Sequence, residues 1–400
     1  MKILVLNCGS SSIKYKLYEM NDEIELATGQ IERVGSEESI FKYKSQKTGE
    51  LKNIQPIKSH SEGISEIINK LCSKEQGVIS NISEITAVGH RVVHGGEKFS
   101  ASIMISPEVI REIENCVPLA PLHNPPNLAG IMACKTIMPQ IPQIAVFDTA
   151  FHQTLPDYAY IYPIPYQLYK NDRIRKYGFH GTSHRYVSLE AAKLVGKRLE
   201  DLKIISCHLG NGASIAAIKY GKSIDTSMGF TPLEGVMMGT RSGSIDPAII
   251  FHLMRTKGLS VDDVDELLNK MSGFLGISGI SNDARDIVEG AKNKDYRADL
   301  ALRMYAYKVK NYIGSYSAIM GGVDLVIITA GVGENTEEIR EYALEDLEYL
   351  GIKLDRNRNL TDMKKTREIT TDDSKVKVFV IFTNEEIMIA RDTKEIIKNK

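Results

Sequence analysis

The sequence has no long apolar run and no clustering of charge of one sign. Its longest apolar runs, such as residues 323–330, have the length of a buried strand and not of a membrane span. The apolar segment at residues 3–6 is too short for a signal peptide. Lys and Arg number 50 against 51 Asp and Glu, spread along the chain. This balance argues against a nucleic-acid surface or a membrane patch. We therefore expect a cytoplasmic protein that binds neither nucleic acid nor membrane.

Cysteine is scarce as well. The five cysteines are odd in number and contain no Cys-x-x-Cys pair, which favours reduced thiols over a disulfide framework or a zinc site. With 42% apolar and 25% charged residues, the composition is that of a globular protein. A chain of 400 residues is too long to form a single ordinary hydrophobic core, so we expect two domains.

The two halves of the chain repeat one plan of strands and helices. In the first half we expect strands at 3–7, 13–18, 24–31, 85–89 and 143–147, and helices from 106 and over 124–138. In the second half we expect strands at 203–207, 213–219, 323–329 and 376–382, and helices over 295–321 and from 384 onward. Each half begins with a buried strand, a tight Gly/Ser turn and a returning strand. This repetition predicts two domains of the same α/β fold.

The two turns contain the residues that a phosphate group needs. Glycine lets backbone N–H groups approach an anion closely, and a nearby cation adds charge. Gly9-Ser10-Ser11-Ser12 is followed by Lys14, and Gly210-Asn211-Gly212 lies at the matching place. The sequence contains no Walker A motif. Either turn alone is as consistent with an ordinary β-turn, but their matching places favour phosphate binding.

A third glycine-rich segment, residues 330–335, follows an apolar strand and precedes a helix. A strand, glycine-rich loop and helix in this order are typical of nucleotide-binding sites. The segment is equally consistent with a simple helix cap, so both interpretations remain open.

Cationic and protonatable side chains are frequent in the expected loops. They are Arg91, His94, His123, His180, His184, His208 and Arg241. The spacing of His180 and His184 resembles that of zinc ligands. However, Thr182-Ser183 is expected to cap a helix that starts after His180, and no acidic residue that could complete a zinc site is adjacent in the sequence. A clamp on a phosphoryl group suits these residues better. Asp148 directly follows a buried strand, where active sites form in open α/β sheets.

Taken together, these segments resemble the acetate kinase family, within the actin-like and sugar-kinase-like ATPases. The resemblance is carried by NCGSSSIK at 7–14, GHRVVHGG at 89–96, LAPLHNPPN at 119–127, FDTAFH at 147–152, YGFHGTSH at 177–184, HLGNGAS at 208–214, DTSMGFTPLEG at 225–235, MGTRSG at 238–243 and TNEE at 383–386. It extends over nearly the whole chain. It implies two duplicated actin-like (ribonuclease H-like) domains with a cleft between them, comprising residues 1–150 plus 385–400 and residues 151–384.

The resemblance also implies a reaction and a set of site residues. The reaction is reversible, direct in-line transfer of the ATP γ-phosphoryl group to acetate, giving acetyl phosphate and ADP, with Mg²⁺ as cofactor and Mn²⁺ as a substitute. The implied catalytic residues are Asp148, His180 and Arg241. The residues implied to bind acetate are Arg91, Val93, Leu122, Phe179 and Pro232. Those implied to bind the metal ion are Asn7 and Glu385. The implied ATP residues are Lys14, His208, Leu209, Gly210, Asn211, Gly212, Asp283, Ala284, Arg285, Gly331, Val332, Gly333, Glu334 and Asn335. A homodimer is implied as well.

The chemistry of the acceptor bears on the role of Asp148. A carboxylic acid with a pKa of about 4 to 5 is already ionised at neutral pH, so acetate needs no general base. We therefore expect Asp148 to organise Mg²⁺, water or an arginine. Two alternatives remain open: a kinase for propionate or butyrate, since one methylene changes discrimination by only about 1–3 kcal/mol, and a non-catalytic actin-like ATP sensor.

Overall fold

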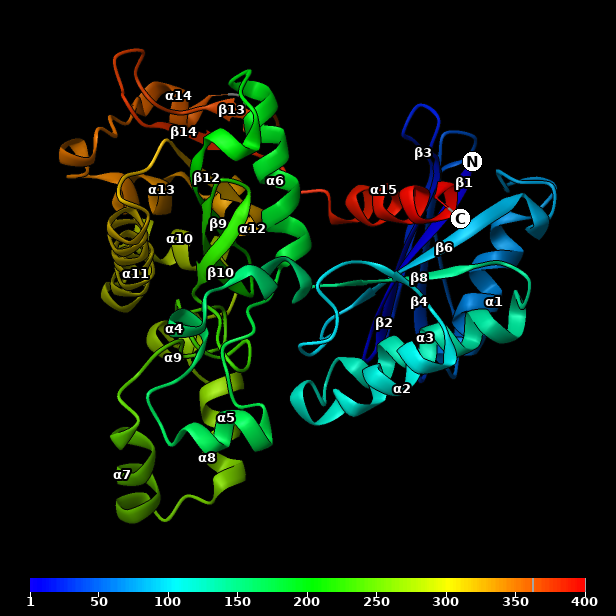
Figure 1. Ribbon diagram of the computed structural model, residues 1–400, viewed down its shortest axis with the longest axis horizontal. Coiled ribbons are helices and arrows are strands. Elements are labelled where there is room, and N and C mark those ends of the chain that lie inside the picture. The colour runs from blue at the N-terminus through cyan, green and yellow to red at the C-terminus, as the bar shows by residue number, and fades with distance from the viewer. Residues whose placement is uncertain (362, 400) are drawn as a thin grey trace. The chain divides into compact units, whose positions relative to one another are not determined.

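The computed structural model describes residues 1–361 and 363–399. Its internal contacts divide the chain into two compact units, each of which contains one β-sheet (Figure 1). Unit 1 comprises Met1–Gln153 and Asn384–Lys400, and unit 2 comprises Thr154–Thr383. Because the chain returns to unit 1 for its last helix, unit 1 is built from both ends of the sequence.

Unit 1 contains an 8-stranded sheet in the order β5-β4-β3-β2-β1-β6-β8-β7. The strands are β1 (Lys2–Gly9), β2 (Ser12–Glu19), β3 (Ile24–Glu32), β4 (Ser36–Ser45), β5 (Gly49–Ile57), β6 (Ile85–Val92), β7 (Ile103–Met104) and β8 (Gln143–Phe147). The first five strands form an antiparallel meander. β6 then pairs in parallel with β1, and β8 with β6.

Helices cover both faces of this sheet. The helices of unit 1 are α1 (His60–Leu71), α2 (Pro107–Asn115), α3 (Asn124–Ile137) and α15 (Glu385–Lys398). Leu4 and Leu6 of β1 are buried in one apolar cluster with residues of α1 and α3. On the other face, Gly89 of β6 leaves space for Ile389 and Thr393 of α15. Because successive side chains of a strand point to opposite faces of the sheet, each face offers an apolar surface to the helices that cover it.

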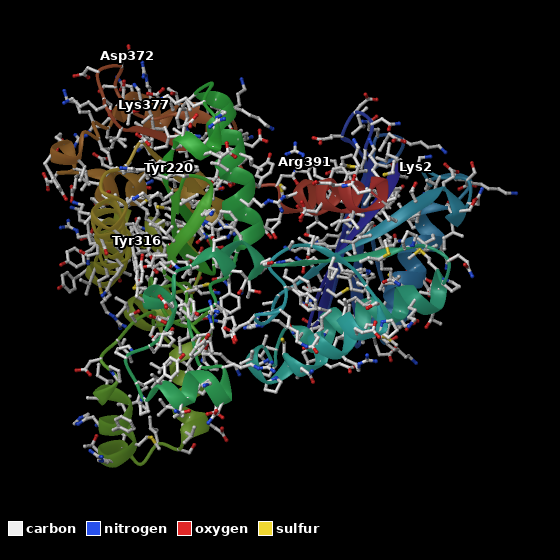
Figure 2. The ribbon with its side chains drawn as sticks, viewed as in Figure 1. Lys2, Tyr220, Tyr316, Asp372, Lys377 and Arg391 are labelled. Carbon is white, nitrogen blue, oxygen red and sulfur yellow. The ribbon has the colours of Figure 1, made fainter. Side chains whose placement is uncertain are left out.

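The C-terminal helix α15 is held to unit 1 by polar contacts as well. Arg391 forms an ion pair of 2.7 Å with Glu23 (Figure 2). Ser102 donates to Asp392 at 2.5 Å, and Lys394 donates to the backbone carbonyl of Met20. Residues from the start and the end of the chain thus form one unit.

Unit 2 contains a 6-stranded sheet in the order β11-β10-β9-β12-β14-β13. The strands are β9 (Lys203–Leu209), β10 (Ala213–Lys219), β11 (Lys222–Thr226), β12 (Leu325–Thr329), β13 (Arg367–Glu368) and β14 (Lys377–Val380). β9, β10 and β11 form an antiparallel meander, whereas β12 pairs in parallel with both β9 and β14. The order β11-β10-β9-β12-β14-β13 thus repeats β3-β2-β1-β6-β8-β7 of unit 1, down to a two-residue antiparallel edge strand. The predicted duplicated α/β fold is confirmed.

The helices of unit 2 surround this second sheet. They include α4 (Asp157–Tyr160), α5 (Tyr166–Asp172), α6 (Gly181–Leu194), α7 (Ala248–Lys257), α8 (Val261–Lys270), α9 (Gly273–Ser278), α10 (Ala284–Lys292), α11 (Tyr296–Met320), α12 (Ala330–Asn335), α13 (Glu337–Leu344) and α14 (Arg356–Leu360). α11 begins at the N-cap Asp295 and ends at Gly321 in the left-handed conformation, as its sequence signals predict. Its Tyr316 lies in the interior of unit 2 (Figure 2).

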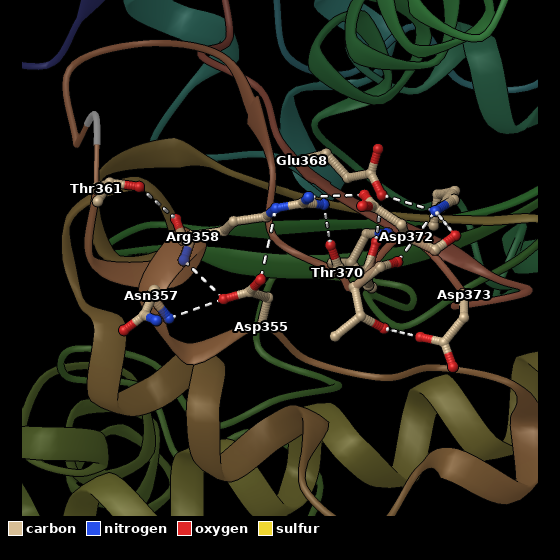
Figure 3. A network of polar contacts seen from close by, with 11 residues as sticks. Asp355, Asn357, Arg358, Thr361, Glu368, Thr370, Asp372 and Asp373 are labelled. Carbon is tan, nitrogen blue, oxygen red and sulfur yellow. Dashed lines mark hydrogen bonds and ion pairs between the residues drawn. The ribbon is translucent and has the colours of Figure 1, made fainter.

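Ion pairs at the rim of unit 2 join α14 to the segments flanking β13. Arg358 donates to the carbonyl of Thr370 at 2.6 Å and pairs with Asp372 at 2.7 Å, and Lys377 pairs with Glu368 at 3.0 Å (Figure 3). These charges are paired with one another at the surface. We assign them a structural role and none in the site.

Three local expectations were wrong. In the predicted half-buried strand 13–18, Tyr18 alternates with the apolar residues and shares the face of Lys14 and Lys16, which predicts exposure to solvent. Tyr18 is instead 2% exposed, because α15 covers that face and its N-cap Asn384 lies 3.4 Å from the Tyr18 hydroxyl. Residues 330–335 were expected as a loop but form the short helix α12. Thr182-Ser183 lies inside α6, whose N-cap position is taken by His180 itself. In the described part of the chain, no helix is long and apolar enough to span a bilayer.

Candidate active site

In unit 1, a guanidinium and a carboxylate from neighbouring parallel strands form a bidentate pair. Arg91 lies near the end of β6 and Asp148 directly follows β8. Nε of Arg91 donates to Oδ1 of Asp148 at 3.0 Å and Nη2 donates to Oδ2 at 2.6 Å. The Asp148 side chain is 2% exposed, so the pair is largely shielded from water. Such fork-shaped pairing fixes the plane of the guanidinium. Asp148 therefore orients Arg91.

Glu385 adds a second carboxylate beside this pair. It is the first residue of α15, and its Oε2 lies 3.7 Å from Nε of Arg91. Burial raises the pKa of Glu385 to about 7; Arg91 lowers this pKa, whereas Asp148 raises it. Burial lowers the pKa of Arg91, but Asp148 and Glu385 outweigh this and raise it above its usual range. Two carboxyl groups and one guanidinium therefore lie close together at this end of the sheet.

Two buried asparagines of α3 hold the backbone next to Arg91. Asn127 accepts from the N–H of Val93 at 3.0 Å and donates to the carbonyl of Cys8 at 2.8 Å. Asn124 accepts from the N–H of His94 at 3.1 Å and donates to its carbonyl at 3.0 Å. The ends of β1 and β6 are therefore tied together through α3. The resemblance gave these asparagines no role, although a buried amide at the start of a helix is a signal that could have found them.

The oxygen donors of unit 1 suit a hard divalent cation. Among residues 1–361 and 363–399, no group of three His, Cys, Asp or Glu side chains is arranged to hold a metal by itself. The carboxylate of Glu385 and the amide of Asn7, at the end of β1, are nevertheless the donor types that Mg²⁺ prefers. Mg²⁺ usually keeps several waters and substrate phosphates among its ligands, so a protein site of few donors fits it.

In unit 2, the expected phosphate turn lies between β9 and β10. It is closed by a bond of 3.1 Å from the N–H of Gly210 to the carbonyl of Gly212. A methyl group added at Gly212 would lie 3.6 Å from Nη1 of Arg241 and 3.7 Å from Nε2 of His180. The structure thus brings together three of the predicted site residues. The space in front of Gly212 is bordered by a guanidinium and an imidazole.

Arg241 differs from Arg91 in its surroundings. Its recorded hydrogen bond is a contact of 3.8 Å to Sδ of Met238, and within the described residues no carboxylate forms an ion pair with it. Burial lowers the pKa of Arg241. A guanidinium that is half-buried and lacks a counter-ion has charge available for an incoming anion.

The histidines of unit 2 form a compact cluster beside the same turn. The rings of His180 and His208 stack with centroids 4.2 Å apart. Nδ1 of His180 lies 2.9 Å from Oγ of Ser214, and Nδ1 of His208 lies 2.8 Å from Oγ of Ser183. His180 itself has φ of 56°, an uncommon left-handed conformation for a residue with a side chain. The stacking, the serine contacts and this backbone conformation together define the orientation of both rings.

The segment 330–335 is organised by a buried carboxylate. Glu334 accepts from the N–H of Ala330 at 2.8 Å and from the N–H of Thr383 at 3.1 Å, and burial raises its pKa. Glu334 thus supports the start of α12, and its side chain is turned into unit 2. Gly331, by contrast, has no heavy atom within 4 Å of an added methyl group. Open space at Gly331 is compatible with a bound nucleoside.

A second residue that supports this segment is Arg340 of α13. It is 0% exposed, and Nη1 donates to the carbonyls of Gly333 at 2.7 Å and Glu334 at 3.1 Å. Its Nε donates to Asn359 at 2.6 Å. Burial and the charge of Arg367 lower the pKa of Arg340 to about 10. Sequence reasoning missed Arg340, because a charged residue in a helix is normally exposed.

The remaining predicted residues are distributed over both units. Asp283 caps α10 and pairs with Arg285, whose side chain is 86% exposed. Of the expected acetate pocket, Val93 is buried and Leu122 is 70% exposed, and both belong to unit 1. Phe179 and Pro232 belong to unit 2. Lys14 is exposed on β2, paired in register with Asn7.

Comparison with known proteins gives consistent results. The chain matches the acetokinase family over residues 2–391. It is 58% identical over 399 residues to an acetate kinase of Thermoanaerobacter pseudethanolicus, covering 100% of this chain and 99% of that one. The crystal structure of Porphyromonas gingivalis acetate kinase superposes with a TM-score of 0.95 at 48% identity, covering 99% of each chain. That of a propionate kinase from Francisella tularensis superposes with a TM-score of 0.92 at 41% identity, covering 98% of this chain and 99% of that one.

Proposed function

The chain belongs to the acetokinase family, and we propose that it catalyses reversible transfer of the γ-phosphoryl group of ATP to acetate, giving acetyl phosphate and ADP. The observation that carries this proposal is the position of Arg241 and His180, which both border the space in front of Gly212. A transferring phosphoryl group carries negative charge on its equatorial oxygens, and preorganised cationic or N–H donors stabilise that charge.

Unit 2 is proposed to hold the nucleotide. The turn from His208 to Gly212 offers backbone N–H groups to the phosphates, with Arg241 and His180 directed at the transferring group. Asp283, Ala284, Arg285 and residues 331–335 would surround the nucleoside. Two observations support this assignment: the open space at Gly331, and the hydrogen bond by which Glu334 accepts from the N–H of Ala330 at the start of α12.

Unit 1 is proposed to hold the acetate, with Arg91 binding its carboxylate. Asp148 would act as a positioning residue that holds Arg91, and no proton needs to be removed from an acceptor that is already ionised. The bidentate bond between the two side chains supports this role. The residues proposed to contact the methyl group of acetate are Val93 and Leu122 in unit 1, and Phe179 and Pro232 in unit 2.

Asn7 and Glu385 are proposed to hold Mg²⁺, with Mn²⁺ as a substitute, and Lys14 to contact the ATP phosphates. When bound, the ion would neutralise charge on the phosphates and fix their orientation. Arg91 and Arg241 would also reduce the repulsion between two anionic substrates. Transfer would then be direct and in line, without a phosphoenzyme.

Acyl phosphate formation tests the proposal directly. The purified chain is incubated with ATP, Mg²⁺ and acetate, and hydroxylamine traps the acyl phosphate as a hydroxamate. We expect acetate-dependent hydroxamate in stoichiometry with ADP. ADP formation that is independent of acetate would instead indicate an ATPase or an ATP sensor, and would overturn the proposal.

A propionate kinase is the second candidate, since a structurally similar relative bears that name. One methylene in an apolar pocket changes discrimination by only about 1–3 kcal/mol. Values of kcat/KM for acetate, propionate and butyrate separate the candidates. We expect acetate to give the highest value.

We further propose a cytoplasmic homodimer. Its location is supported by five cysteines that are all free thiols, as in a reducing compartment. Dimerisation is supported by exposed apolar side chains on α7 and α8, including Phe251 at 54% and Val261 at 69% exposure. Light scattering gives the mass of the particle; a monomer of 44.5 kDa at micromolar concentration would contradict the dimer.

A further inference from the structure

A continuous chain of hydrogen bonds leads from His180 into the core of unit 2. Nδ1 of His180 lies 2.9 Å from Oγ of Ser214, and the same oxygen lies 2.8 Å from Nε2 of His184. Nδ1 of His184 in turn lies 2.8 Å from Oγ of Ser206. These four side chains, called the His180 relay below, connect α6 to the neighbouring strands β9 and β10.

The relay lies inside the protein and not on its surface. Ser206, Ser214 and His184 are each 0% exposed. A buried polar group without a hydrogen bond costs about 1–3 kcal/mol, so each member needs the next one. Because side chains at His180 and His184 are four residues apart, both rings reach Ser214 from the start of α6. The relay therefore fixes the direction in which the His180 ring points.

The relay also restricts where the proton of a neutral His180 can reside. A neutral imidazole has one N–H donor and one acceptor nitrogen, and a hydroxyl has one proton to donate. In one order, Ser206 donates to His184, Nε2–H of His184 donates to Ser214, and Ser214 donates to Nδ1 of His180. His180 then carries its proton on Nε2. In the opposite order every bond reverses, and the proton of His180 lies on Nδ1.

For a neutral His180, only the first order suits phosphoryl transfer. The Nε2 side of the His180 ring faces the space in front of Gly212, where Nη1 of Arg241 also lies. Phosphoryl oxygens accept hydrogen bonds and do not donate them, so the nitrogen facing this space must carry the proton. In the opposite order, a lone pair would face the phosphoryl oxygens and repel them.

We propose that Ser214 and His184 are positioning residues that hold His180 as its Nε2–H tautomer, with its ring edge directed at the phosphoryl group. The inference rests on the proposed function, since it gives His180 a partner in transfer. His208 stacks on the same ring and Arg241 borders the same space, so the relay directs the N–H of His180 to a space that other cationic or protonatable groups also border.

Two serine-to-alanine variants of the full chain test this proposal. Ser214→Ala removes the central hydroxyl of the relay, whereas Ser188→Ala is the matched control. Ser188 is also buried and on α6, but its hydroxyl donates at 2.7 Å to the backbone carbonyl of His184 and not to a ring. We expect Ser214→Ala to lower kcat about 10- to 100-fold, as loss of an orienting outer hydrogen bond does at other sites. KM for ATP and acetate should change little, and Ser188→Ala should leave kcat near the wild-type value.

A spectroscopic measurement separates orientation from folding. Ring ¹⁵N chemical shifts report the tautomer of each histidine, and the His180 signal is identified by its absence in His180→Gln. We expect the Nε2–H form in the wild type and a mixture of tautomers in Ser214→Ala. If Ser214→Ala does not fold, Ser206→Ala, which removes only the outer bond, should shift the His184 and His180 signals in the same direction.

Three outcomes would overturn the relay. They are an Nδ1–H tautomer of His180 in the wild type, unchanged His180 shifts in both folded relay variants, and an equal loss of kcat in Ser188→Ala. The tautomer is measured without substrates. A wild-type protein that makes no acyl phosphate would therefore refute the proposed function alone, while the ring shifts would still decide the relay.

Discussion

The two units use one sheet plan but place opposite chemistry at the same position. In unit 1 the residue two places before the first glycine of the turn is Asn7, paired in register with Lys14. In unit 2 the equivalent pair is His208 and Ser214. Lys14 is exposed, whereas Ser214 is 0% exposed and lies against two imidazoles. The same duplicated fold thus presents an exposed cation in one unit and a buried network of hydrogen-bonded side chains in the other.

The arginines show the same contrast. Arg91 of unit 1 is bound to Asp148, and two carboxylates raise its pKa despite burial. Arg241 of unit 2 forms no ion pair with any described carboxylate, and burial lowers its pKa. Unit 1 therefore holds its guanidinium in place with compensated charge, while unit 2 leaves its guanidinium uncompensated. An incoming phosphoryl group would gain more from the second arrangement.

The largest expected effect is at Arg241. Because its charge lacks a counter-ion, Arg241→Ala should lower kcat by about 10³-fold or more, as for arginines that stabilise phosphoryl transfer elsewhere. Arg241→Lys should restore little, since an ammonium lacks the planar fork. Steady-state kinetics measure both, with Arg303→Ala as an exposed control. A near-normal kcat with a raised KM for acetate would show that Arg241 only binds substrate.

A methyl group at Gly212 tests the space between Arg241 and His180. The added carbon would meet its neighbours only at ordinary contact distances of 3.6 Å or more, so Gly212→Ala should fold. It would nevertheless occupy the position proposed for the phosphoryl group, and we expect a loss in kcat/KM for ATP of about 100-fold, or about 2.7 kcal/mol. Gly314→Ala is the control, because Gly314 of α11 is half-buried and an added methyl group there would meet only the hydroxyl of Tyr349, at 3.9 Å. Full activity of Gly212→Ala would place the phosphoryl group elsewhere.

Asp148→Asn tests whether unit 1 works by holding its arginine. Removal of one charge-assisted bond is worth about 1.5–3 kcal/mol, which corresponds to a drop of about 10- to 100-fold in kcat/KM for acetate. If Asp148 positions Arg91, the loss should be constant over the pH range in which acetate is ionised. A loss that appears in kcat alone, together with a missing ionisation in the pH–rate profile, would indicate a proton acceptor instead.

His90 of unit 1 is a histidine without a role in the proposed site and contrasts with the cluster of unit 2. It is 2% exposed, and burial lowers its pKa to about 4; its Nε2 lies 2.8 Å from the side chain of Gln143. Between pH 6.5 and 4 the unfolded chain binds a proton that the folded chain does not. Stability should therefore fall as pH falls through this range, by up to about 1.4 kcal/mol per pH unit.

Urea unfolding of wild type and His90→Gln across pH 4–7 measures this slope. The difference between the two proteins isolates His90 from the other titrating groups. Above about pH 6.5 both states are neutral at this residue and the difference should become constant. Parallel pH profiles would show that His90 is protonated in the folded protein as readily as in the unfolded one.

Much of the fold could be predicted from local patterns. The strands Gln143–Phe147 and Ala213–Lys219 have the predicted bounds, because apolar runs between turn residues define them. β4 and β5 were missed, since their alternating charged residues resemble a surface loop. Tyr18 was misplaced because the helix that buries it begins at Glu385. Contacts between distant segments are not visible in a local pattern.

The site, too, depends on contacts between distant segments that the sequence alone does not show. Motif residues such as His180, Arg241 and Gly212 could be named from the sequence, and the structure brings them together within unit 2. Most of the residues that support the site could not, although His184 was named as a candidate phosphate ligand. Ser214 and Arg340 act through partners that only the folded chain supplies, and a buried serine or arginine has no distinctive sequence signal. The pairing of Arg91 with Asp148 likewise depends on the parallel register of β6 and β8.

The smallest expected effect concerns Val93 of unit 1, one of the residues proposed to contact the acyl chain. Val93 is 7% exposed, and its backbone N–H donates to Asn127 at 3.0 Å. Val93→Ala removes two methyl groups and opens space beside the acyl chain. The ratio of kcat/KM for acetate to that for propionate should fall, by about 1–2 kcal/mol.

The ratio must be measured within one variant, because loss of a buried side chain also lowers stability, by about 1 kcal/mol or more. Catalysis should suffer less than in Arg241→Ala, since no charge is removed from the transition state. Val92→Ala is a matched control: Val92 is equally buried, but belongs to the apolar cluster of α2 and α3 behind the strand. It should lower stability and leave the ratio unchanged. An unchanged ratio in Val93→Ala would mean that residue 93 does not contact the acyl chain, and the preference for acetate would need another origin.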